Sequence, residues 1–299
     1  MIVQVHDLWK RYGRFDALHG LEFAVPEGSA FALLGPNGAG KTTTIKILVN
    51  ILAPSRGTAS ILGVDSRAIS PRQLDSIGYV SENQDLPGRL TVAEYLDYLR
   101  PFYPRWDVAV ETALRRDLQL PAARRIRDLS HGMRIKMALA CALPFRPRLL
   151  ILDEPFAGLD PLVRDELIDG LLRQAGELTI LISSHELVEI EGLATDLGFL
   201  HEGRMMFQEP MNRLTARCRE VYVTLASTAS VPDPIPAHWL QPRAVGNVLM
   251  FVETRFSDDT IGEQVRMLCD DVRRIDVKPM TLRSIFTTLA PAARDGVLS

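Results

Sequence analysis

The sequence predicts an α/β protein with a parallel β-sheet, and three observations lead to this prediction. Two apolar runs each precede a stretch with apolar residues at helical spacing: 149–152 before 162–175, and 178–183 before 186–194. A third apolar run, 29–34, ends in a glycine-rich loop that leads into a helical pattern at 42–52. Alternating buried strands and helices are typical of a parallel sheet that is covered by helices.

Regions of different character are expected around this sheet. The N-terminal residues alternate between apolar and polar and predict antiparallel strands at 2–8 and 21–25, joined by a polar turn at 10–16. Residues 70–147 predict a helical insertion that is punctuated by prolines. Its amphipathic segments are 92–100, 108–118 and 133–143.

The alternation of strands and helices stops past residue 203, which predicts a second domain. The expected strands there are 220–225, 248–253 and 274–277, and the expected helices are 261–268 and 282–289. A proline-rich stretch at 231–242 is expected to connect the first two strands. We therefore expect a first domain over 1–210, with a helical subdomain over about 70–147, and a small α+β accessory or regulatory domain over 211–299.

Length and charge narrow the function classes. A chain of 299 residues is long enough for two domains with sizeable cores. Lys and Arg total 34 against 37 Asp and Glu, and the net charge of -3 gives no global field that would recruit nucleic acid or anionic lipid. We therefore expect no nucleic-acid partner.

Further features predict a cytoplasmic protein that does not cross a bilayer. Its apolar runs are far shorter than the roughly 20 residues that a membrane-spanning helix needs, and residues 1–10 lack the layout of a secretory signal. Cys141, Cys218 and Cys269 are widely separated and odd in number, which fits neither a disulfide framework nor a CxxC metal site. We interpret them as buried or idle thiols.

The glycine-rich loop has the spacing of the phosphate-binding P-loop, G-x-x-x-x-G-K-T. The residues expected to bind phosphate are Gly35, Pro36, Asn37, Gly38, Ala39, Gly40, Lys41, Thr42 and Thr43. Backbone N–H groups and a helix N-terminus favour phosphate, Lys41 neutralises its charge, and Thr42 offers a hydroxyl to Mg²⁺. A glycine-rich turn that matches the motif by chance is the alternative. Because only five of the 34 basic residues are lysines, a chance match would rarely place a lysine at this position of the motif.

A second motif is the apolar strand at 149–152 that ends in Asp153 and Glu154. It would deliver both carboxylates to the C-terminal edge of a parallel sheet, where ligands bind. The order predicts Asp153 as a Mg²⁺ ligand through water and Glu154 as the base for an attacking water. A solvated turn is the alternative, which the accompanying P-loop makes the weaker one.

Between these motifs lies the sequence Leu129-Ser130-His131-Gly132-Met133, directly before a predicted helix. In this position it resembles the signature sequence of ATP-binding cassette (ABC) ATPases. The chain resembles, over roughly 1–210, the ATP-binding subunits of bacterial ABC transporters. The fold implied is a P-loop NTPase with an antiparallel β subdomain and a helical insertion.

The resemblance implies a role for several further residues. Tyr12 matches the aromatic that stacks on adenine, and a packing tyrosine is the alternative. Ser130 and Gly132 match groups that contact the γ-phosphate held by the other protomer, and Ser130 is also expected to cap its helix. Asp160 belongs to the loop after the acidic strand. His185 matches the switch histidine, and a purely structural role is its alternative.

Two departures from the family pattern affect the expected site. The family usually has LSGGQ, so His131 and Met133 replace a glycine and the glutamine, which predicts a weaker signature contact. In the family, a glutamine in this region senses the metal and the attacking water. By spacing, its position in this chain is occupied by Glu82, and the glutamine of the segment is Gln84. We favour Glu82 and expect Thr42, Glu82 and Asp153 around the metal.

The resemblance implies an ATPase that uses ATP and Mg²⁺ and forms an ATP-dependent homodimer, head to tail. Its function would be to power transport, with export as the expected direction, through a separate permease on the cytoplasmic face of the inner membrane. The permease is expected to dock near residues 82–90 and the helical insertion. Seven apolar and aromatic side chains in this stretch offer a surface for it; we expect most of them in the core and at most a third of them in contact with the permease. These are Leu90, Tyr95, Tyr98, Leu99, Phe102, Tyr103 and Trp106. The alternatives are a soluble ABC-type ATPase in repair, regulation or on the ribosome, and a P-loop kinase outside this family.

Overall fold

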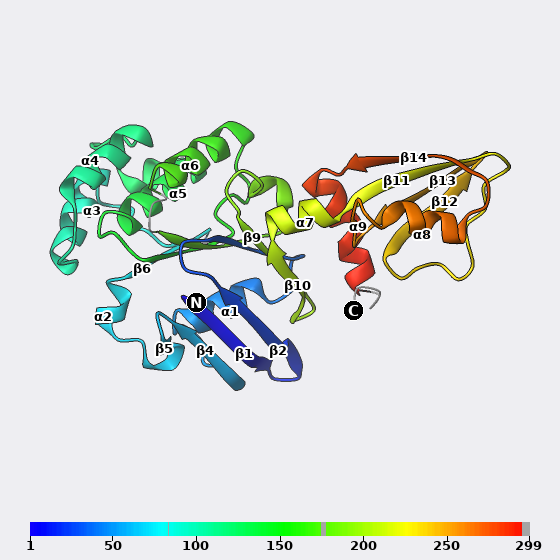
Figure 1. Ribbon diagram of the computed structural model, residues 1–299. Coiled ribbons are helices and arrows are strands. Elements are labelled where there is room, and N and C mark those ends of the chain that lie inside the picture. Colours follow the sequence, from blue (N-terminus) through cyan, green and yellow to red (C-terminus); the bar gives the residue numbers. More distant parts are fainter. Residues whose placement is uncertain (83, 175–177, 295–299) are drawn as a thin grey trace. The chain divides into compact units, whose positions relative to one another are not determined.

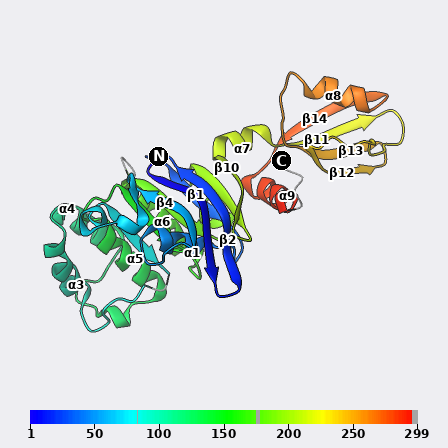
Figure 2. The same cartoon turned by 90° about the horizontal axis from the view of Figure 1, so that it is seen from below.

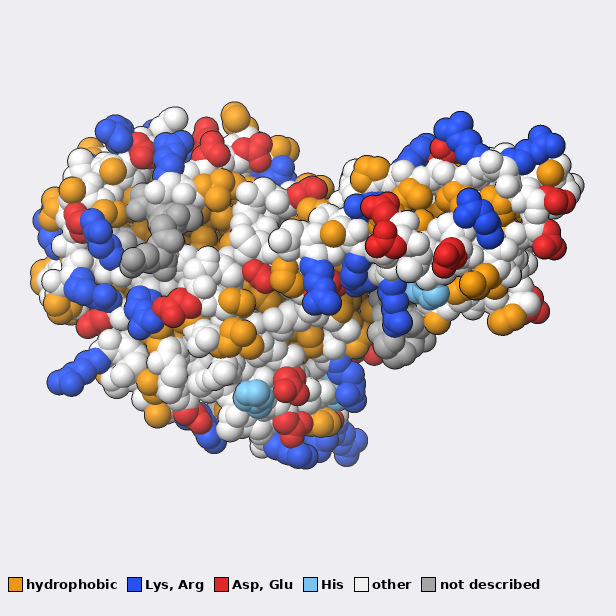
Figure 3. Space-filling view, viewed as in Figure 1, with side chains coloured by type: hydrophobic (Ala, Val, Ile, Leu, Met, Phe, Trp, Pro, Cys, Tyr) orange, Lys and Arg blue, Asp and Glu red, His pale blue; other side chains and the backbone are white. Residues whose placement is uncertain are grey.

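The computed structural model describes residues 1–82, 84–174 and 178–294. The chain divides into two compact units, Met1–Gln208 and Glu209–Ser299. On the face shown in Figure 3, basic and acidic side chains are interspersed rather than segregated, in keeping with the net charge of -3. Among the described residues, no helix combines the length and the hydrophobicity needed to cross a membrane.

A six-stranded sheet organises the first unit, with the strand order β10-β9-β3-β8-β7-β6. The strands are β3 (Ala30–Leu34), β6 (Ile77–Ser81), β7 (Leu149–Asp153), β8 (Thr179–Ser184), β9 (Asp196–His201) and β10 (Arg204–Pro210). The pairs β6–β7, β7–β8, β3–β8 and β3–β9 are parallel. Every residue of β3, β7 and β8 is buried, as the three apolar runs predict.

The helices of this unit begin at residues that cap them. Asp107 accepts from Ala109 N and Val110 N at the start of α4, and Thr91 forms a capping box with Glu94 at the start of α3. The helices are α1 (Lys41–Leu48), α2 (Pro71–Leu74), α3 (Val92–Leu99), α4 (Val108–Asp117), α5 (His131–Ala142) and α6 (Pro161–Gln174). Short 3₁₀ turns are η1 (Ser66–Ala68), η2 (Arg100–Phe102), η3 (Ile126–Asp128) and η4 (Leu187–Glu189).

An antiparallel sheet, with the order β2-β1-β4-β5, forms the second layer of the unit. Its strands are β1 (Val3–Tyr12), β2 (Phe15–Val25), β4 (Arg56–Ile61) and β5 (Val64–Asp65). The turn expected at 10–16 is wrong: β1 and β2 continue until Tyr12 pairs with Phe15, because Gly13 at φ 58° allows a tight turn. Helix α1 contacts both sheets (Figure 1), and Phe23 of β2 stacks on Phe31 of β3 in the shared core.

Two further predictions for this unit need correction. The helix expected at 186–194 is only the turn η4. The Ser184 hydroxyl accepts from Glu186 N and bonds to the Glu189 carboxylate, and such side-chain contacts offer this segment an alternative to a regular helix. The insertion expected over 70–147 is not wholly helical, since it contains β6 of the parallel sheet. The predicted end of the helix at 162–175 lies outside the described residues.

The second unit is a four-stranded antiparallel sheet with the order β12-β13-β11-β14. Its strands are β11 (Arg219–Leu225), β12 (Trp239–Val245), β13 (Val248–Glu253) and β14 (Val272–Pro279), and its helices are α7 (Met211–Arg217), α8 (Ile261–Leu268) and α9 (Leu282–Arg294). Helix α8 covers one face of the sheet (Figure 2), where Ile261 and Val265 join Val221, Val223 and Phe251 in a core.

Strand β12 overlaps the stretch expected to be a proline-rich connection. Trp239 is buried and stacks on Phe251 of β13, with ring centroids 3.7 Å apart. Pro242 lies where the register shifts between Leu240 and Arg243, which is where an edge strand accepts proline.

The three cysteines are buried free thiols. Burial raises the pKa of Cys218 to about 11 and also raises the pKa of Cys141. Such thiols are poor nucleophiles.

Candidate active site

The glycine-rich loop lies between β3 and α1, and two of its glycines are required by close packing. A Cβ on Gly35 would lie 2.2 Å from the carbonyl oxygen of Leu200. Gly40 has φ 108°, and a Cβ there would lie 2.7 Å from Leu18 Cδ2. The base of the loop is therefore fixed against the fold, while Pro36, Asn37 and Gly38 at its tip are exposed.

Lys41 is the first residue of α1 and is only 5% exposed. Its Nζ donates to the carbonyl oxygens of Gly35, at 2.6 Å, and Pro36, at 3.2 Å. The same Nζ lies 3.1 Å from Glu154 Oε1. A single buried ammonium thus connects the loop to the end of β7.

Asp153 ends β7 and holds two hydroxyl groups. Its Oδ1 accepts from Thr42 Oγ1 at 3.0 Å and from Ser183 Oγ at 2.7 Å. Burial raises the pKa of the Asp153 carboxyl, and these two hydrogen bonds oppose that rise. Glu82 N donates to the backbone oxygen of Asp153 at 3.0 Å, which brings Glu82 to the same edge of the sheet.

Glu154 connects the ammonium of Lys41 to the ring of His185. Its Oε2 lies 2.8 Å from His185 Nδ1. The backbone of Glu154 has φ 51°, a conformation that residues other than glycine rarely adopt. The hydrogen bond from Glu154 raises the pKa of His185, and burial opposes this rise. A carboxylate, an ammonium and an imidazole therefore form one connected group.

Two residues that the sequence did not indicate complete this group. Ser183 Oγ accepts from Glu154 N at 3.0 Å while it donates to Asp153, so it fixes both carboxylate residues. Glu189 is buried, bonds to the Ser184 hydroxyl, and has a carboxylate oxygen within 4.8 Å of ligand atoms of Glu154 and His185. Burial raises the pKa of Glu189. The paired serines at the end of β8 are the signal that could have indicated them.

The signature residues stand at the start of α5. Ser130 is the N-cap, with its Oγ accepting from Met133 N at 3.3 Å, and a Cβ on Gly132 would lie 2.9 Å from Val163 Cγ1. His131 Nε2 lies 3.1 Å from the carbonyl oxygen of Ala157, in the loop after β7. Asp160 accepts from Val163 N at 3.1 Å near the start of α6, so it has a capping role that the sequence reasoning missed.

Several of the expected site residues are not brought together within one chain. Across the described residues, no hydrogen bond or ion pair connects Tyr12, Ser130 or Gly132 to the Lys41–Glu154 contact. Tyr12 is 44% exposed at the end of β1, with Lys10 Nζ 5.1 Å from its ring centroid.

The Glu82 and Gln84 side chains line the same cavity of about 340 Å³, together with His131 and Arg134 of α5. Gln84 Oε1 is buried without a hydrogen-bond partner in the described part of the chain. A ligand in this cavity could therefore contact either residue. That Glu82 rather than Gln84 has the role of the family's glutamine stays a prediction.

The aromatic side chains of the insertion divide into exposed and packed groups. Tyr98 and Phe102 are 59% and 61% exposed, and their rings lie 5.3 Å apart. Tyr103 stacks on Phe145 at 4.2 Å. The exposed pair provides an apolar surface on the insertion.

Comparisons with known proteins agree on the type of protein. A family profile described as "ABC transporter" matches residues 18–157. The bacitracin transport ATP-binding protein BcrA of Enterococcus faecalis is 33% identical over 225 residues, which cover 73% of this chain and 72% of that protein. The probable multidrug ABC transporter ATP-binding protein YbhF of Escherichia coli is 32% identical over 213 residues, and the chain spans only 36% of its length.

Solved structures show the same similarity. The structure of an ATP-binding subunit of an ABC transporter superposes with a TM-score of 0.65 at 31% identity, covering 72% of this chain and 92% of that one. A dimeric bacterial ABC transporter cassette, at 21% identity, superposes with a TM-score of 0.62 over 70% of this chain and 98% of its own. Both cover a part of this chain equivalent in size to the first unit.

Proposed function

Because the chain belongs to the family of ABC transporter ATP-binding subunits, we propose that it hydrolyses ATP and couples hydrolysis to transport through a separate permease. One observation carries the ATPase proposal: the Glu154 carboxylate lies between Lys41 Nζ and His185 Nδ1, beside the Thr42–Asp153 contact. Phosphate-binding, metal-binding and proton-accepting groups thus converge at one sheet edge.

The residues at this edge suit the steps of ATP hydrolysis. The loop 35–43 and Lys41 would bind the phosphates of ATP, and Glu154 would accept a proton from the water that attacks the γ-phosphorus. The bond to the leaving ADP oxygen breaks as the new phosphorus–oxygen bond forms. His185, held by Glu154, would donate a hydrogen bond to the γ-phosphate.

The donor set at Asp153 fits Mg²⁺. The Thr42 hydroxyl and the Asp153 carboxylate are hard oxygen ligands 3.0 Å apart, and Glu82 follows beside them. Mg²⁺ bound there would neutralise the charge of the phosphates. Thr42, Asp153 and Glu82 would hold it, as the sequence predicts.

A second copy is proposed to complete the site. Ser130 and Gly132 lie at the N-terminus of α5, a favourable position for a phosphate, yet they are not connected to the Lys41 loop of their own chain. In a head-to-tail homodimer, they would reach the ATP of the other copy. Asp160 lies at the start of α6 beside them, and Tyr12 would stack on adenine.

The partner proposed for transport is a membrane-embedded permease, which would place the chain on the cytoplasmic face of the inner membrane. The exposed Tyr98–Phe102 pair and the cavity beside Glu82 support this contact. Export is the proposed direction, in line with relatives named for multidrug, bacitracin and lantibiotic transport, although a sulfate/thiosulfate relative is named for import. None of these four relatives is named for a non-transport role.

The experiment that tests the ATPase proposal measures ATP turnover and ATP binding of Glu154→Gln. Loss of the proton acceptor should lower kcat by on the order of 100-fold or more, while ATP still binds because Lys41 and the loop remain. Glu191→Gln is the matched control, since Glu191 is exposed and makes no described ion pair. Turnover that is unchanged in Glu154→Gln would contradict the proposal.

Transport itself is tested by reconstitution with any multi-span membrane protein that is found to be encoded next to this gene. Substrate-stimulated ATP turnover in liposomes, lost in Glu154→Gln, is the expected result. A chain that hydrolyses ATP yet never associates with that permease would favour the soluble alternative.

A further inference from the structure

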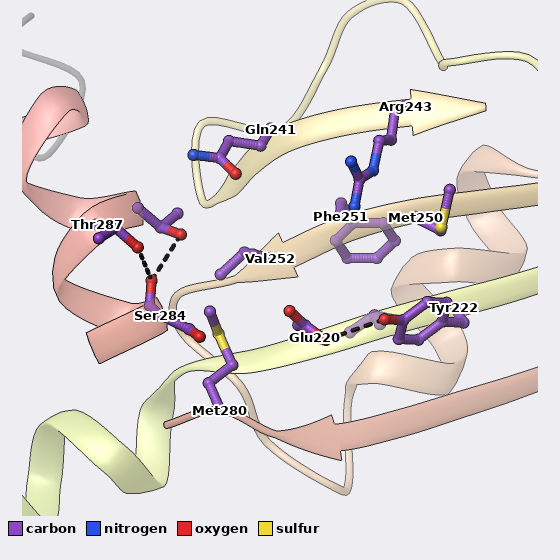
Figure 4. Close-up of a pocket in the computed structure, with 12 residues that line it drawn as sticks. Glu220, Tyr222, Gln241, Arg243, Met250, Phe251, Val252, Met280, Ser284 and Thr287 are labelled. Carbon is purple, nitrogen blue, oxygen red and sulfur yellow. Dashed lines mark hydrogen bonds between the residues drawn. The ribbon is translucent and has the colours of Figure 1, made fainter. Parts of the chain in front are cut away.

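The second unit contains a pocket on the face of its sheet that α8 leaves uncovered. Alternate residues of β11 and β13 point to this face, among them Glu220, Tyr222, Met250 and Val252, while their neighbours pack against α8. Helix α9 closes one end of the face. The resulting pocket has a volume of about 210 Å³ (Figure 4).

The shape of this pocket depends on the irregularity in β12. Arg243 pairs with Met250, and the register shift after Leu240 leaves Gln241 outside the regular ladder. Figure 4 shows Gln241 and Arg243 on β12 along one side, with Glu220 and Tyr222 on β11 along the other. The two sides are separated by β13, which places their backbones about 10 Å apart.

On one side of the pocket lie Arg243, which can only donate hydrogen bonds, and Gln241, whose amide can both donate and accept them. The Arg243 guanidinium has five N–H donors and no acceptor, and no carboxylate among the described residues forms an ion pair with it. Its charge nevertheless acts across the pocket, because it lowers the pKa of Tyr222 while the bond to Glu220 raises that pKa more strongly. An unpaired guanidinium at a pocket wall favours a carboxylate or another anion.

The opposite side is rich in acceptors. Glu220 Oε2 accepts from Tyr222 Oη at 3.0 Å. Lys278 of β14 pairs with Glu220 across the sheet, and its Nζ lies 4.7 Å from the centroid of the Tyr222 ring, but it forms no ion pair with the Glu220 carboxylate in the described part of the chain. Thr287 and Thr288 of α9 donate their hydroxyl protons to the carbonyl oxygen of Ser284, at 3.0 and 2.9 Å. Their oxygens, at the end of the pocket that α9 closes, are therefore left as acceptors (Figure 4). Together with the Glu220 carboxylate they favour a cationic N–H group in the pocket.

Apolar side chains lie between the two polar sides. Met250, Val252 and Met280 contribute the apolar part of the lining, and methionine adapts its shape to small ligands. The volume is below the roughly 300–1,000 Å³ typical of pockets for drug-sized molecules. The ligand that fits is therefore small and carries an anionic group, a cationic group and an apolar part.

We propose that this pocket binds a small zwitterion of the size of a free amino acid, with its carboxylate on Arg243 and its ammonium on Glu220. The site is separate from the Lys41–Glu154 group and makes no use of ATP. Such a ligand would give the unit Glu209–Ser299 the ability to respond to a metabolite.

The experiment titrates the full chain with each common L-amino acid by calorimetry, in the absence of nucleotide. At least one amino acid should bind saturably with one site per chain. Its N-acetyl derivative and its amide, which each lack one charge, should both bind at least about tenfold more weakly. Glu220→Gln and Arg243→Gln should each weaken binding of the free amino acid to a similar degree.

Arg274→Gln is the matched control, because Arg274 lies on β14, pairs with Asp276 and does not line the pocket. It should bind like the unaltered chain. An unchanged melting temperature and unchanged ATP binding in each variant would show that the fold is intact. The proposal is overturned if no amino acid binds at concentrations up to about 10 mM, if both pocket variants bind normally, or if acetate binds as well as the amino acid.

Discussion

At the scale of the residue, His131 is the position at which this chain departs most visibly from the glycine usual in the signature sequence. Its Nε2 lies 3.1 Å from the carbonyl oxygen of Ala157, and Gly132 beside it packs on Val163. The start of α5 is thereby joined to the loop that follows Glu154. A displacement of the signature residues would therefore be transmitted to the loop beside the proposed catalytic base.

Replacement of His131 tests this connection. His131→Gly restores the usual family residue but removes the hydrogen bond, which is worth about 1 kcal/mol. We expect ATP turnover to fall roughly fivefold with little change in KM, because the nucleotide-binding loop is untouched. His131→Gln, which keeps an N–H donor, should recover part of the loss.

The measurement is steady-state ATP turnover together with the melting temperature of each variant. A loss of turnover with an unchanged melting temperature supports a positioning role. Full activity in His131→Gly would show that the contact with Ala157 has no part in turnover.

The contact between His185 and Glu154 makes a prediction about pH. Because Glu154 raises the pKa of His185 in the folded chain above its ordinary value of 6.5, the pair stabilises the fold fully below that ordinary value. The contribution is lost as pH rises through the raised pKa of the folded state. Titration of the His185 ring by NMR, without nucleotide, should show the raised pKa.

Glu154→Gln is the variant that checks the cause of the shift. It should return the pKa of His185 toward the ordinary value, while His201, which bonds to no carboxylate in the described residues, serves as the internal reference. A His185 titration that is the same in both proteins would show that Glu154 does not set it.

Site residues that stand in a contiguous sequence motif could be predicted, whereas those brought in by the pairing of distant strands could not. Lys41, Thr42, Asp153 and Glu154 stand in motifs whose spacing predicts the edge at which the structure places them. Ser183 was missed because its contact with Asp153 arises from the pairing of β7 with β8, which no local spacing encodes. The roles of all these residues remain predictions.

At the scale of the element, the fully buried strands β3, β7 and β8 were predictable, whereas the edge strands β10 and β12 were not. The runs that became β3, β7 and β8 are mainly apolar, whereas β10 has only exposed and half-buried residues and β12 contains a proline. The pattern at 186–194 fits a helix, but side chains of Ser184 and Glu189 hold it as a turn. Tertiary contacts thus decided the elements whose patterns were ambiguous.

The packing of α5 on α6 contains an ion pair whose partners can be altered separately. Lys136 is buried, and its Nζ lies 2.6 Å from Glu166 Oε2, which is partly exposed. Glu166→Gln leaves the buried ammonium without its partner and should lower the free energy of unfolding by about 1–2 kcal/mol, less than for a fully buried pair. Chemical denaturation measures this change.

Two further variants separate the ion pair from general effects of altering these helices. Asp169→Asn, at an exposed position of α6 with no ion pair in the described part of the chain, should change the free energy of unfolding by less than about 0.5 kcal/mol. Lys136→Met combined with Glu166→Gln should recover stability relative to Glu166→Gln alone, because no unpaired charge remains buried. A double variant less stable than either single one would contradict the assignment.

At the scale of the whole molecule, each of the two units has a hydrophobic core of its own, and these two cores share no residue in the described part of the chain. The core of the first unit includes Phe23, Phe31 and Ile151, and the core of the second includes Val221, Trp239 and Phe251. All residues of the proposed ATP site lie in Met1–Gln208, and the proposed zwitterion pocket lies in Glu209–Ser299. We therefore expect the first unit to fold, and to bind nucleotide as proposed, without the second.

Removal of residues 211–299 tests this independence. A chain that ends at Pro210 keeps β10 complete, including Gln208, whose side chain bonds to the backbone of Ala24 in β2. We expect it to fold and to bind ATP within about threefold of the full chain, since every residue of the phosphate-binding loop is retained. Because we expect the second unit to act on dimer lifetime or coupling, turnover in the presence of the permease should change more than ATP affinity. Calorimetry with ATP and turnover assays on both lengths of chain measure the two effects, and an equal loss of both would show that 211–299 is part of the catalytic fold.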